Sequence, residues 1–501
     1  MPEGGRRARL GAEPIGEGRV EFCVWAPGAE VAVRVRGEDH ELPPVGDGFR
    51  AAAVEAAAGD RYVFVTGGHE WPDPCSRAQP DGVRGPSQVI EVPAARPGPR
   101  LELAELVIYE LHVGTFSLEG TFDGAIPRLA GLRELGVGAI ELMPVATGPG
   151  ERGWGYDGLY TSAPHRAYGG PEGLGRLIDA AHADGLGVIL DVVYNHLGPG
   201  SEAITAFGPY VSSGRENLWG GALDYSRGGV REWAIQNAEL FVGGYGADGL
   251  RLDAVHAIFD DSPLHVLREL RDRVKALSPA ALVISEVGEE DFRPLDQWKH
   301  DAVWLDTLHH HLHALLTGER EGYYEHFGSI EGVVRELGRE RPERLVVGAQ
   351  NHDQVGNRAL GDRLPASMHR IALAVCLFSL STPLLFMGEE YNETRPFQFF
   401  TDHDDPGIAE ATRAGRKREF ERFSAFSGEV PDPQDERTFL RSRLAPREPD
   451  TLYLRLLELR RELPRELETQ ADGDRLVLRR GRVELVVDFD LETVQLLGAS
   501  S

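Results

Sequence analysis

The chain has 501 residues, 41% of them hydrophobic, a length and composition typical of a globular protein with about three domains. Its 53 Lys and Arg residues against 80 Asp and Glu residues give a formal net charge of −27. So acidic a chain argues against nucleic acid and anionic membranes as partners, because both are bound through basic surfaces, and it suits a neutral polar ligand.

Several features bear on the cellular compartment. The cysteines Cys23, Cys75 and Cys376 lie far apart and predict neither a disulfide framework nor a Cys-based zinc site. Residues Met1–Gly11 carry arginines without the apolar run of a secretory signal. The longest apolar stretch, Ile371–Met387, is interrupted by polar residues and a proline, which predicts a buried helix leading into a buried strand. A cytoplasmic location is therefore expected.

Residues 1–95 predict an immunoglobulin-like β-sandwich. Hydrophobic residues skip one position at a time from Val20 to Val24 and again from Val31 to Val35, as in half-buried strands, and glycine-containing pairs mark the turns. A Pro- and Ala-rich linker, Pro93–Pro99, follows this module.

Residues 96–463 predict a (β/α)8 TIM barrel, because short apolar runs alternate with helix-length amphipathic segments. No glycine-rich phosphate loop follows the first strand, which disfavours an open dinucleotide-binding sheet. The predicted strands are Val107–His112, Ala139–Met143, Gly187–Val193, Gly249–Leu252, Val283–Glu286, Ala302–Trp304, Leu345–Gly348 and Leu384–Met387. The predicted helices are Asp123–Leu135, Pro171–Asp184, Arg231–Tyr245, Pro263–Leu277, Ala366–Leu380 and Asp450–Glu462.

Residues 464–501 predict a small antiparallel β-domain. The alternating runs Arg475–Leu478, Val483–Val487 and Thr493–Leu496 read as short strands. So short a segment buries little surface by itself, so we expect it to rest on the barrel.

Ionisable residues follow several predicted barrel strands, at the end where barrel enzymes hold their active sites. Glycoside hydrolysis needs one ionised and one protonated carboxylate on either side of the bond. Asp253 is the candidate for the ionised group, because Arg251 points to the same side of the strand. Glu286, for which apolar surroundings are expected from Val283, Ile284 and Val287, is the candidate for the proton donor. Asp353 follows the seventh strand. Any one of these carboxylates could instead cap a helix or fill a salt bridge, but their shared position favours catalysis.

Histidines and aromatic residues are predicted to surround these carboxylates. His196 and His352 can donate hydrogen bonds to sugar hydroxyls. Trp154 and Tyr156, before the third strand, can pack against the apolar faces of a sugar, although core packing explains Trp154 equally well.

Four segments resemble, in order and spacing, the four motifs of the α-amylase family of retaining glycosidases, over about residues 106–425. They are Asp191–His196, Gly249–His256, Ser285–Val287 and Asn351–Asp353. The resemblance implies that Asp253 is the nucleophile, Glu286 the general acid/base and Asp353 the carboxylate that supports the transition state. The substrate-binding residues expected are Trp154, Tyr156, Asp191, His196, Arg251, His256, Asp306, His309, His310, His352, Gln354 and Asn357.

Within that family, Asn351–Ala359, Gly388–His403 and Gly415–Phe420 resemble the malto-oligosyltrehalose trehalohydrolases. Phe22–Pro27 resembles their amino-terminal domain too, but also that of branching and debranching enzymes. The resemblance implies hydrolysis of the α-1,4 bond beside the trehalose end of malto-oligosyltrehalose, without a cofactor, on a substrate made by a companion synthase. A debranching or branching enzyme and a non-catalytic glucan-binding protein remain alternatives.

One segment departs from the family pattern. After Trp304, the family places Asp-Asp-Phe before two histidines, whereas this chain has Thr307 and Leu308 in the last two of those positions. The change bears on the fit of the leaving trehalose. His309 and His313, one helical turn apart, would be the best zinc pair, but no cysteine or neighbouring carboxylate frames them and no metal is predicted.

Overall fold

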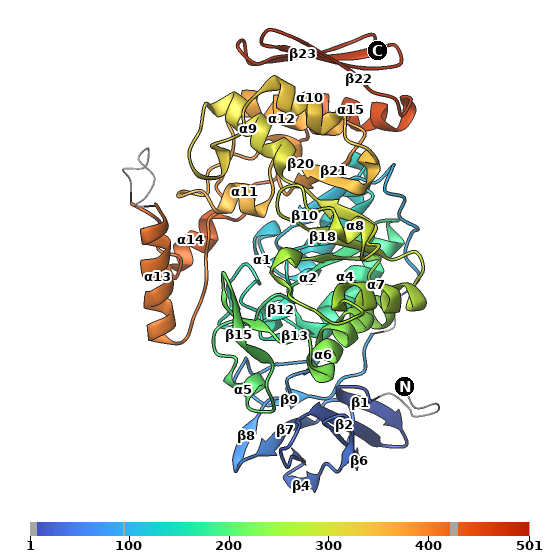
Figure 1. Ribbon diagram of the computed structural model, residues 1–501, viewed down its shortest axis with the longest axis vertical. Coiled ribbons are helices and arrows are strands. Elements are labelled where there is room, and N and C mark those ends of the chain that lie inside the picture. The colour runs from blue at the N-terminus through green and yellow to red at the C-terminus, as the bar shows by residue number, and fades with distance from the viewer. Residues whose placement is uncertain (1–7, 94–95, 421–428, 500–501) are drawn as a thin grey trace.

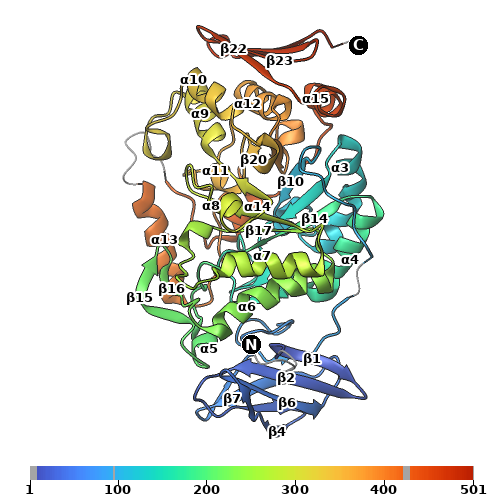
Figure 2. The same cartoon turned by 45° about the vertical axis from the view of Figure 1, so that its right-hand side comes forward.

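The computed structural model describes residues 8–93, 96–420 and 429–499, so residues 94–95 of the predicted linker lie outside the described residues. A closed barrel of eight parallel strands occupies the centre, and antiparallel sheets lie at its two opposite ends (Figures 1 and 2). None of the described helices is both long and apolar enough to span a bilayer.

All eight predicted barrel strands are present, and seven of them match within one residue at each end. They are β10 (Ile108–Leu111), β11 (Ala139–Leu142), β14 (Gly187–Val192), β17 (Gly249–Leu252), β18 (Leu282–Glu286), β19 (Ala302–Trp304), β20 (Leu345–Gly348) and β21 (Thr382–Phe386). Each pairs in parallel with the next, and β21 pairs with β10 to close the barrel. The predicted (β/α)8 fold is therefore confirmed.

Helices cover the outside of the barrel, most of them where the sequence predicts. They are α2 (Phe122–Ala125), α3 (Leu129–Leu135), α4 (Gly170–Ala183), α6 (Gly228–Glu239), α7 (Val266–Leu277), α9 (Thr307–Thr317), α10 (Ile330–Leu337), α12 (Ala366–Phe378) and α15 (Thr451–Glu462). The helix predicted over residues 123–135 is divided by a 3-10 turn at Ile126–Arg128, because Pro127 lacks the N–H that a continuous helix requires. The end of the helix predicted at Arg231–Tyr245 is a π-helical segment, Leu240–Tyr245.

Short helices and hairpins complete the barrel domain around the strand ends. They are α1 (Val113–Phe116), β12 (Ala146–Thr147), β13 (Tyr160–Pro164), α5 (Glu202–Thr205), β15 (Val211–Asn217), β16 (Gly220–Leu223), α8 (Arg293–Asp296), α11 (His352–Gly356), α13 (Pro406–Phe420) and α14 (Glu436–Arg441).

Two antiparallel sheets form the N-terminal sandwich. One has the order β1 (Gly11–Gly16), β2 (Arg19–Trp25), β6 (Phe49–Glu55), β5 (Pro44–Gly46), and the other β4 (Glu38–Glu41), β3 (Ala32–Val35), β7 (Arg61–Thr66), β8 (His69–Trp71), with β9 (Ser87–Gln88) on β7. The alternating residues Val20, Phe22 and Val24 are buried between the sheets, as their spacing predicts. Phe207 of the barrel domain enters the same core, where its ring lies 5.9 Å from that of Phe64.

The C-terminal sheet has four strands, β22 (Glu468–Asp472), β23 (Arg475–Arg480), β24 (Val483–Asp488) and β25 (Thr493–Leu497). The sequence predicts the last three but not β22, whose residues are mostly polar and exposed. Leu476 and Leu485 are buried in the same core cluster as the barrel helices, which gives this small sheet the support that it needs.

Candidate active site

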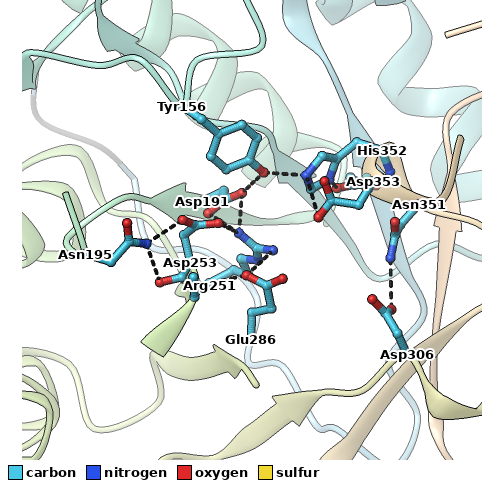
Figure 3. A network of polar contacts seen from close by, with 12 residues as sticks. Tyr156, Asp191, Asn195, Arg251, Asp253, Glu286, Asp306, Asn351, His352 and Asp353 are labelled. Atoms are coloured by element: carbon cyan, nitrogen blue, oxygen red, sulfur yellow. Dashed lines mark hydrogen bonds and ion pairs between the residues drawn. The ribbon is translucent and has the colours of Figure 1, made fainter. Parts of the chain in front are cut away.

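The polar side chains predicted at the strand ends meet over one end of the barrel (Figure 3). Asp191 stands on β14, Arg251 on β17 and Glu286 at the end of β18. Asp253 follows β17 directly, and Asp353 lies in the first turn of α11. The parallel register brings these strand ends to one edge, so residues up to 162 positions apart in the sequence (353 − 191) face a common space.

Arg251 is buried and contacts three carboxylates. Its Nη1 lies 2.9 Å from Asp191 Oδ2 and 2.8 Å from Asp253 Oδ1, and its Nη2 lies 3.0 Å from Glu286 Oε2. The guanidinium also lies over the Trp304 ring, 4.3 Å from its centre. Burial lowers the pKa of Arg251, but the surrounding carboxylates outweigh burial and raise it well above its usual value, so the cation is permanent.

Asp253 is held through both of its carboxylate oxygens. Oδ1 accepts from Arg251, and Oδ2 accepts a hydrogen bond of 2.5 Å from the side-chain amide of Asn195. Asn195 also donates to the Asp253 carbonyl at 3.0 Å, which fixes the direction of the aspartate. Asn195 is absent from the predicted site residues, although it lies inside the Asp191–His196 motif, where its position between two predicted site residues was a usable signal.

Glu286 does not stand in the apolar surroundings that its sequence neighbours suggest. Its Oε2 contacts Arg251 and accepts a hydrogen bond of 2.7 Å from the Ala254 backbone N–H. Ala254 has a left-handed conformation, with φ of 40°, which is strained for a residue other than glycine. The expectation of an apolar environment fails because Val283 and Ile284 are buried in the hydrophobic core clusters, away from the polar end where the carboxylate lies.

His352 joins the first barrel strand to the site. Its Nδ1 and its backbone N–H both contact the carboxylate of Glu110 on β10, and its Nε2 lies 2.8 Å from the Tyr156 hydroxyl. That hydroxyl donates to Asp191 Oδ2 at 2.6 Å. Burial lowers the pKa of His352, but Asp353 and Glu110 outweigh it and raise the pKa to about 10, so the ring is a cation at neutral pH. Glu110 was not predicted; an acidic residue inside an apolar strand was its signal.

Asp353 is the most open of the three proposed catalytic carboxylates. Its side chain is 34% exposed, with Oδ2 3.4 Å from His352 Nε2, and Asn357 donates to Oδ1 at 3.0 Å. Asn351 caps the helix that carries it, because its side-chain oxygen accepts from the Gln354 N–H at 2.8 Å. The cap directs Asp353 toward the common space and leaves it free to meet a ligand.

Asp306 lies beside this group and is half-buried. It accepts hydrogen bonds from the side-chain amides of Asn351 at 3.1 Å and Gln354 at 2.8 Å. Burial, followed by the charges of Glu286 and Asp353, raises the pKa of Asp306 to about 7. At neutral pH this side chain can therefore both donate and accept hydrogen bonds.

The four histidines of α9 are buried rather than open to solvent. His309 contacts the Ala349 carbonyl through Nδ1 and the Tyr324 hydroxyl through Nε2 at 3.2 Å. His310 packs against Tyr323, and its Nδ1 has no partner among the described residues. Burial lowers the pKa of His310 to about 4, so the ring is neutral.

No group of three or more potential ligands among the described residues is arranged to hold a metal ion. His313, one half of the possible zinc pair, lies 2.9 Å from Glu319 Oε2 and 3.3 Å from an Arg358 nitrogen instead. Glu319 is thus the carboxylate partner that the sequence did not suggest, and it forms an ion-pair network rather than a metal site.

The remaining predicted binding residues lie at different depths. The Trp154 ring is buried, stacks on Phe397 at 5.3 Å and donates to a backbone carbonyl, an arrangement that favours the packing interpretation. His196 is buried and stacks at 5.0 Å on Trp219, whose ring is about half exposed. His256 is exposed, on a 3-10 turn directly after the Asp253 segment.

Comparisons with known proteins agree with this geometry. The family model described as the alpha amylase catalytic domain matches residues 71–214. A malto-oligosyltrehalose trehalohydrolase of Deinococcus radiodurans is 41% identical over 94% of this chain and 87% of that protein, and one of Arthrobacter ramosus is 41% identical over 94% and 92%. The crystal structure of a putative alpha amylase from Salmonella typhimurium superposes with a TM-score of 0.85 at 35% identity and covers 95% of this chain and 92% of that one. The chain belongs to the malto-oligosyltrehalose trehalohydrolases, within the α-amylase family of glycosidases.

Proposed function

We propose that this protein hydrolyses the α-1,4-glucosidic bond next to the trehalose end of malto-oligosyltrehalose and releases trehalose and a shortened maltodextrin. The observation that carries the chemistry is the single guanidinium of Arg251, which contacts Asp253 and Glu286 at 2.8 and 3.0 Å. Two carboxylates held by one cation face the same space, and the resemblance to the α-amylase family implies that they act in a double displacement with retention of configuration. The substrate is inferred from the relatives that share about two fifths of the sequence.

In the first step, the Asp253 carboxylate attacks the anomeric carbon as the bond to the trehalose oxygen breaks. Arg251 and Asn195 already hold both Asp253 oxygens, so one of them can bond to carbon without a large movement of the side chain. The electron pair of the broken bond goes to the leaving oxygen, which receives a proton from Glu286. The products of this step are trehalose and a glucan joined covalently to Asp253.

Glu286 is suited to donate that proton by its accessibility. Its side chain is 21% exposed, against 10% for Asp253 and 1% for Asp191, so it is the one of these three carboxyls that the leaving oxygen can reach most easily. In the second step Glu286 takes a proton from water, whose oxygen attacks the anomeric carbon and frees Asp253.

Asp353, His352 and Tyr156 would hold the sugar as positive charge develops on its ring. Asp353 supplies a negative charge that is open to the ligand, and the cationic His352 holds the Tyr156 hydroxyl in position. Asp306 and the neutral His310 would meet the leaving trehalose. Thr307 donates to Glu336 at 2.6 Å and Leu308 is buried, so the two residues that depart from the family pattern contribute to packing rather than to the open site.

The test is an assay for free trehalose after incubation with malto-oligosyltrehalose, and on a branched glucan in parallel. Trehalose from the first substrate and no products from the second are expected. Release of chains from branch points instead would identify a debranching enzyme. Asp253→Asn, which keeps the shape of the side chain, should lose at least about a thousandfold in kcat because the nucleophile is gone.

We also propose that the protein works in the cytoplasm beside a synthase that makes its substrate, and that it does not bind nucleic acid. The three cysteines are unpaired and buried, which is usual in a reducing compartment. The net charge of −27 opposes binding to phosphate backbones. Trehalose production by the two proteins from maltodextrin together, and by neither alone, is the expected result.

A further inference from the structure

A cavity of about 310 Å³ lies between the N-terminal sandwich and the barrel domain, separate from the carboxylates. The sandwich contributes Trp71 and Arg84 to its lining, and the barrel domain contributes Pro149, Ala203 and His403. The volume is at the lower end of the range of about 300–1,000 Å³ that small-molecule sites occupy.

Both walls of this cavity are held in place by packing between the two domains. The rings of Trp25 and Tyr210 lie 5.3 Å apart, and Phe207 is buried in the sandwich core. In both views α5, which carries Ala203, lies next to the sandwich (Figures 1 and 2). The cavity therefore lies between two domains that pack directly against each other.

The lining has the chemistry of a carbohydrate site. Trp71, at the end of β8, is half-buried, so part of its ring is available to pack against the apolar face of a sugar. Arg84 and Glu202 are exposed at the rim and can exchange hydrogen bonds with hydroxyls. His403 has a side chain only 4% exposed, yet its Nδ1 has no hydrogen-bond partner among the described residues. A buried polar nitrogen without a partner costs stability unless a ligand or water satisfies it.

The cavity also has a neighbour on the side of the candidate active site. His403 and Pro149 line a second, smaller cavity of about 30 Å³ together with Gly155 and Asp157, the residues on either side of Tyr156. His403 Nε2 lies 3.7 Å from Asp157 Oδ2. The Trp71 cavity therefore lies toward Tyr156, on the side of the site away from Asp306.

We propose that this cavity binds the far end of the glucan chain, several glucose units from the bond that is cut. The proposal rests on the proposed function, since it takes the substrate to be a linear α-1,4-glucan with trehalose at one end. The trehalose end would occupy the space near Asp306. In a sufficiently long substrate, the glucan would extend past Tyr156 and His403 to Trp71. The N-terminal sandwich would then make the affinity for the substrate depend on the length of its glucan.

The test compares substrates of different glucan length. In the unaltered protein, KM for malto-oligosyltrehalose should fall as the glucan becomes long enough to reach Trp71. Trp71→Ala should remove this fall, which raises KM for the long substrate about fivefold, the size of one lost aromatic contact. Ala203→Phe, which fills the cavity from the opposite wall, should have the same effect without altering the sandwich. Val45→Ala, at an exposed position on the sandwich and outside the cavity, should keep the length dependence of the unaltered protein.

A binding measurement separates this proposal from the proposed function. Calorimetry with maltotriose and maltoheptaose on Asp253→Asn measures binding without turnover. Maltoheptaose should bind more tightly than maltotriose, and adding Trp71→Ala should abolish this margin in affinity. If both Trp71→Ala and Ala203→Phe retain the margin, the cavity is not a glucan site, even where trehalose is released. If the margin is lost in both but no trehalose is ever formed, the glucan site stands and the proposed reaction fails.

Discussion

Single residues in this protein act through the groups that they hold in place. Arg251 is the clearest case, since its guanidinium contacts Asp191, Asp253 and Glu286 at once. The sequence allows the Arg251–Asp253 contact to be predicted, because residues two apart on a strand share a face. Glu110 and Asn195 could not be placed in the same way, because their roles depend on partners 242 and 58 residues away.

His352 provides a test of the charges in the site. Its pKa is about 10 in the folded protein, above the value of about 6.5 for an unfolded histidine. A raised pKa means that the folded state binds the proton more tightly, so this stabilisation is complete below pH 6.5 and is lost as pH rises toward 10. In urea unfolding, the stability advantage of the unaltered protein over His352→Asn should be larger at pH 6 than at pH 9.5. The exposed His69→Asn serves as the control, and an advantage for His352 that does not change with pH would contradict the assignment.

At the scale of helices and strands, hydrophobic pattern predicts the structure where burial alone determines it. The barrel strands are buried runs and match the predictions closely. Helix α9 was not predicted because four of its eleven residues are histidines, which obscure the hydrophobic periodicity of a helix. All four histidines are nevertheless buried. Strand β22 was missed for the opposite reason, since its mostly exposed polar residues are held by hydrogen bonds to β23.

The attachment of the C-terminal sheet depends on Arg480 of β23. This buried side chain donates to the backbone carbonyls of Leu463 and Pro464, both at 3.0 Å. Arg480→Met should leave these carbonyls without a partner and lower the free energy of unfolding by about 2 kcal/mol. Arg479→Met, on the exposed face of the same strand, should change stability little because its ion pairs are with surface carboxylates. Equal losses in the two variants, measured by denaturant unfolding, would show that the buried contacts are not what holds the sheet.

At the scale of the whole molecule, the sequence predicts three domains but not how they pack against one another. The sandwich packs on the barrel through contacts such as that between Trp25 and Tyr210, which are far apart in the chain and carry no local signal. The cavity at Trp71 exists only because of this packing, so sequence pattern could not reveal it.

Gly229, at the start of α6, allows the two domains to approach. A Cβ atom at this position would lie 2.0 Å from the Trp25 ring, whereas one at Gly228 would meet nothing within 4 Å. Gly229→Ala should therefore force the sandwich away and destabilise the protein by about 1–3 kcal/mol, as overpacking does. Gly228→Ala should be neutral or slightly stabilising, because alanine favours the helix. Thermal unfolding of the two variants checks this, and indistinguishable midpoints would mean that the domains are not in close contact.

The most direct test of the account is the configuration of the new reducing end. Asp253 and Glu286 share the Arg251 guanidinium, so the reaction should proceed through a glycosyl-enzyme and retain configuration. Proton NMR in the first minutes of hydrolysis, before the anomers equilibrate, should show the α-anomer of the released maltodextrin. Appearance of the β-anomer first would mean that water attacks the substrate directly, and would contradict the roles given to both carboxylates.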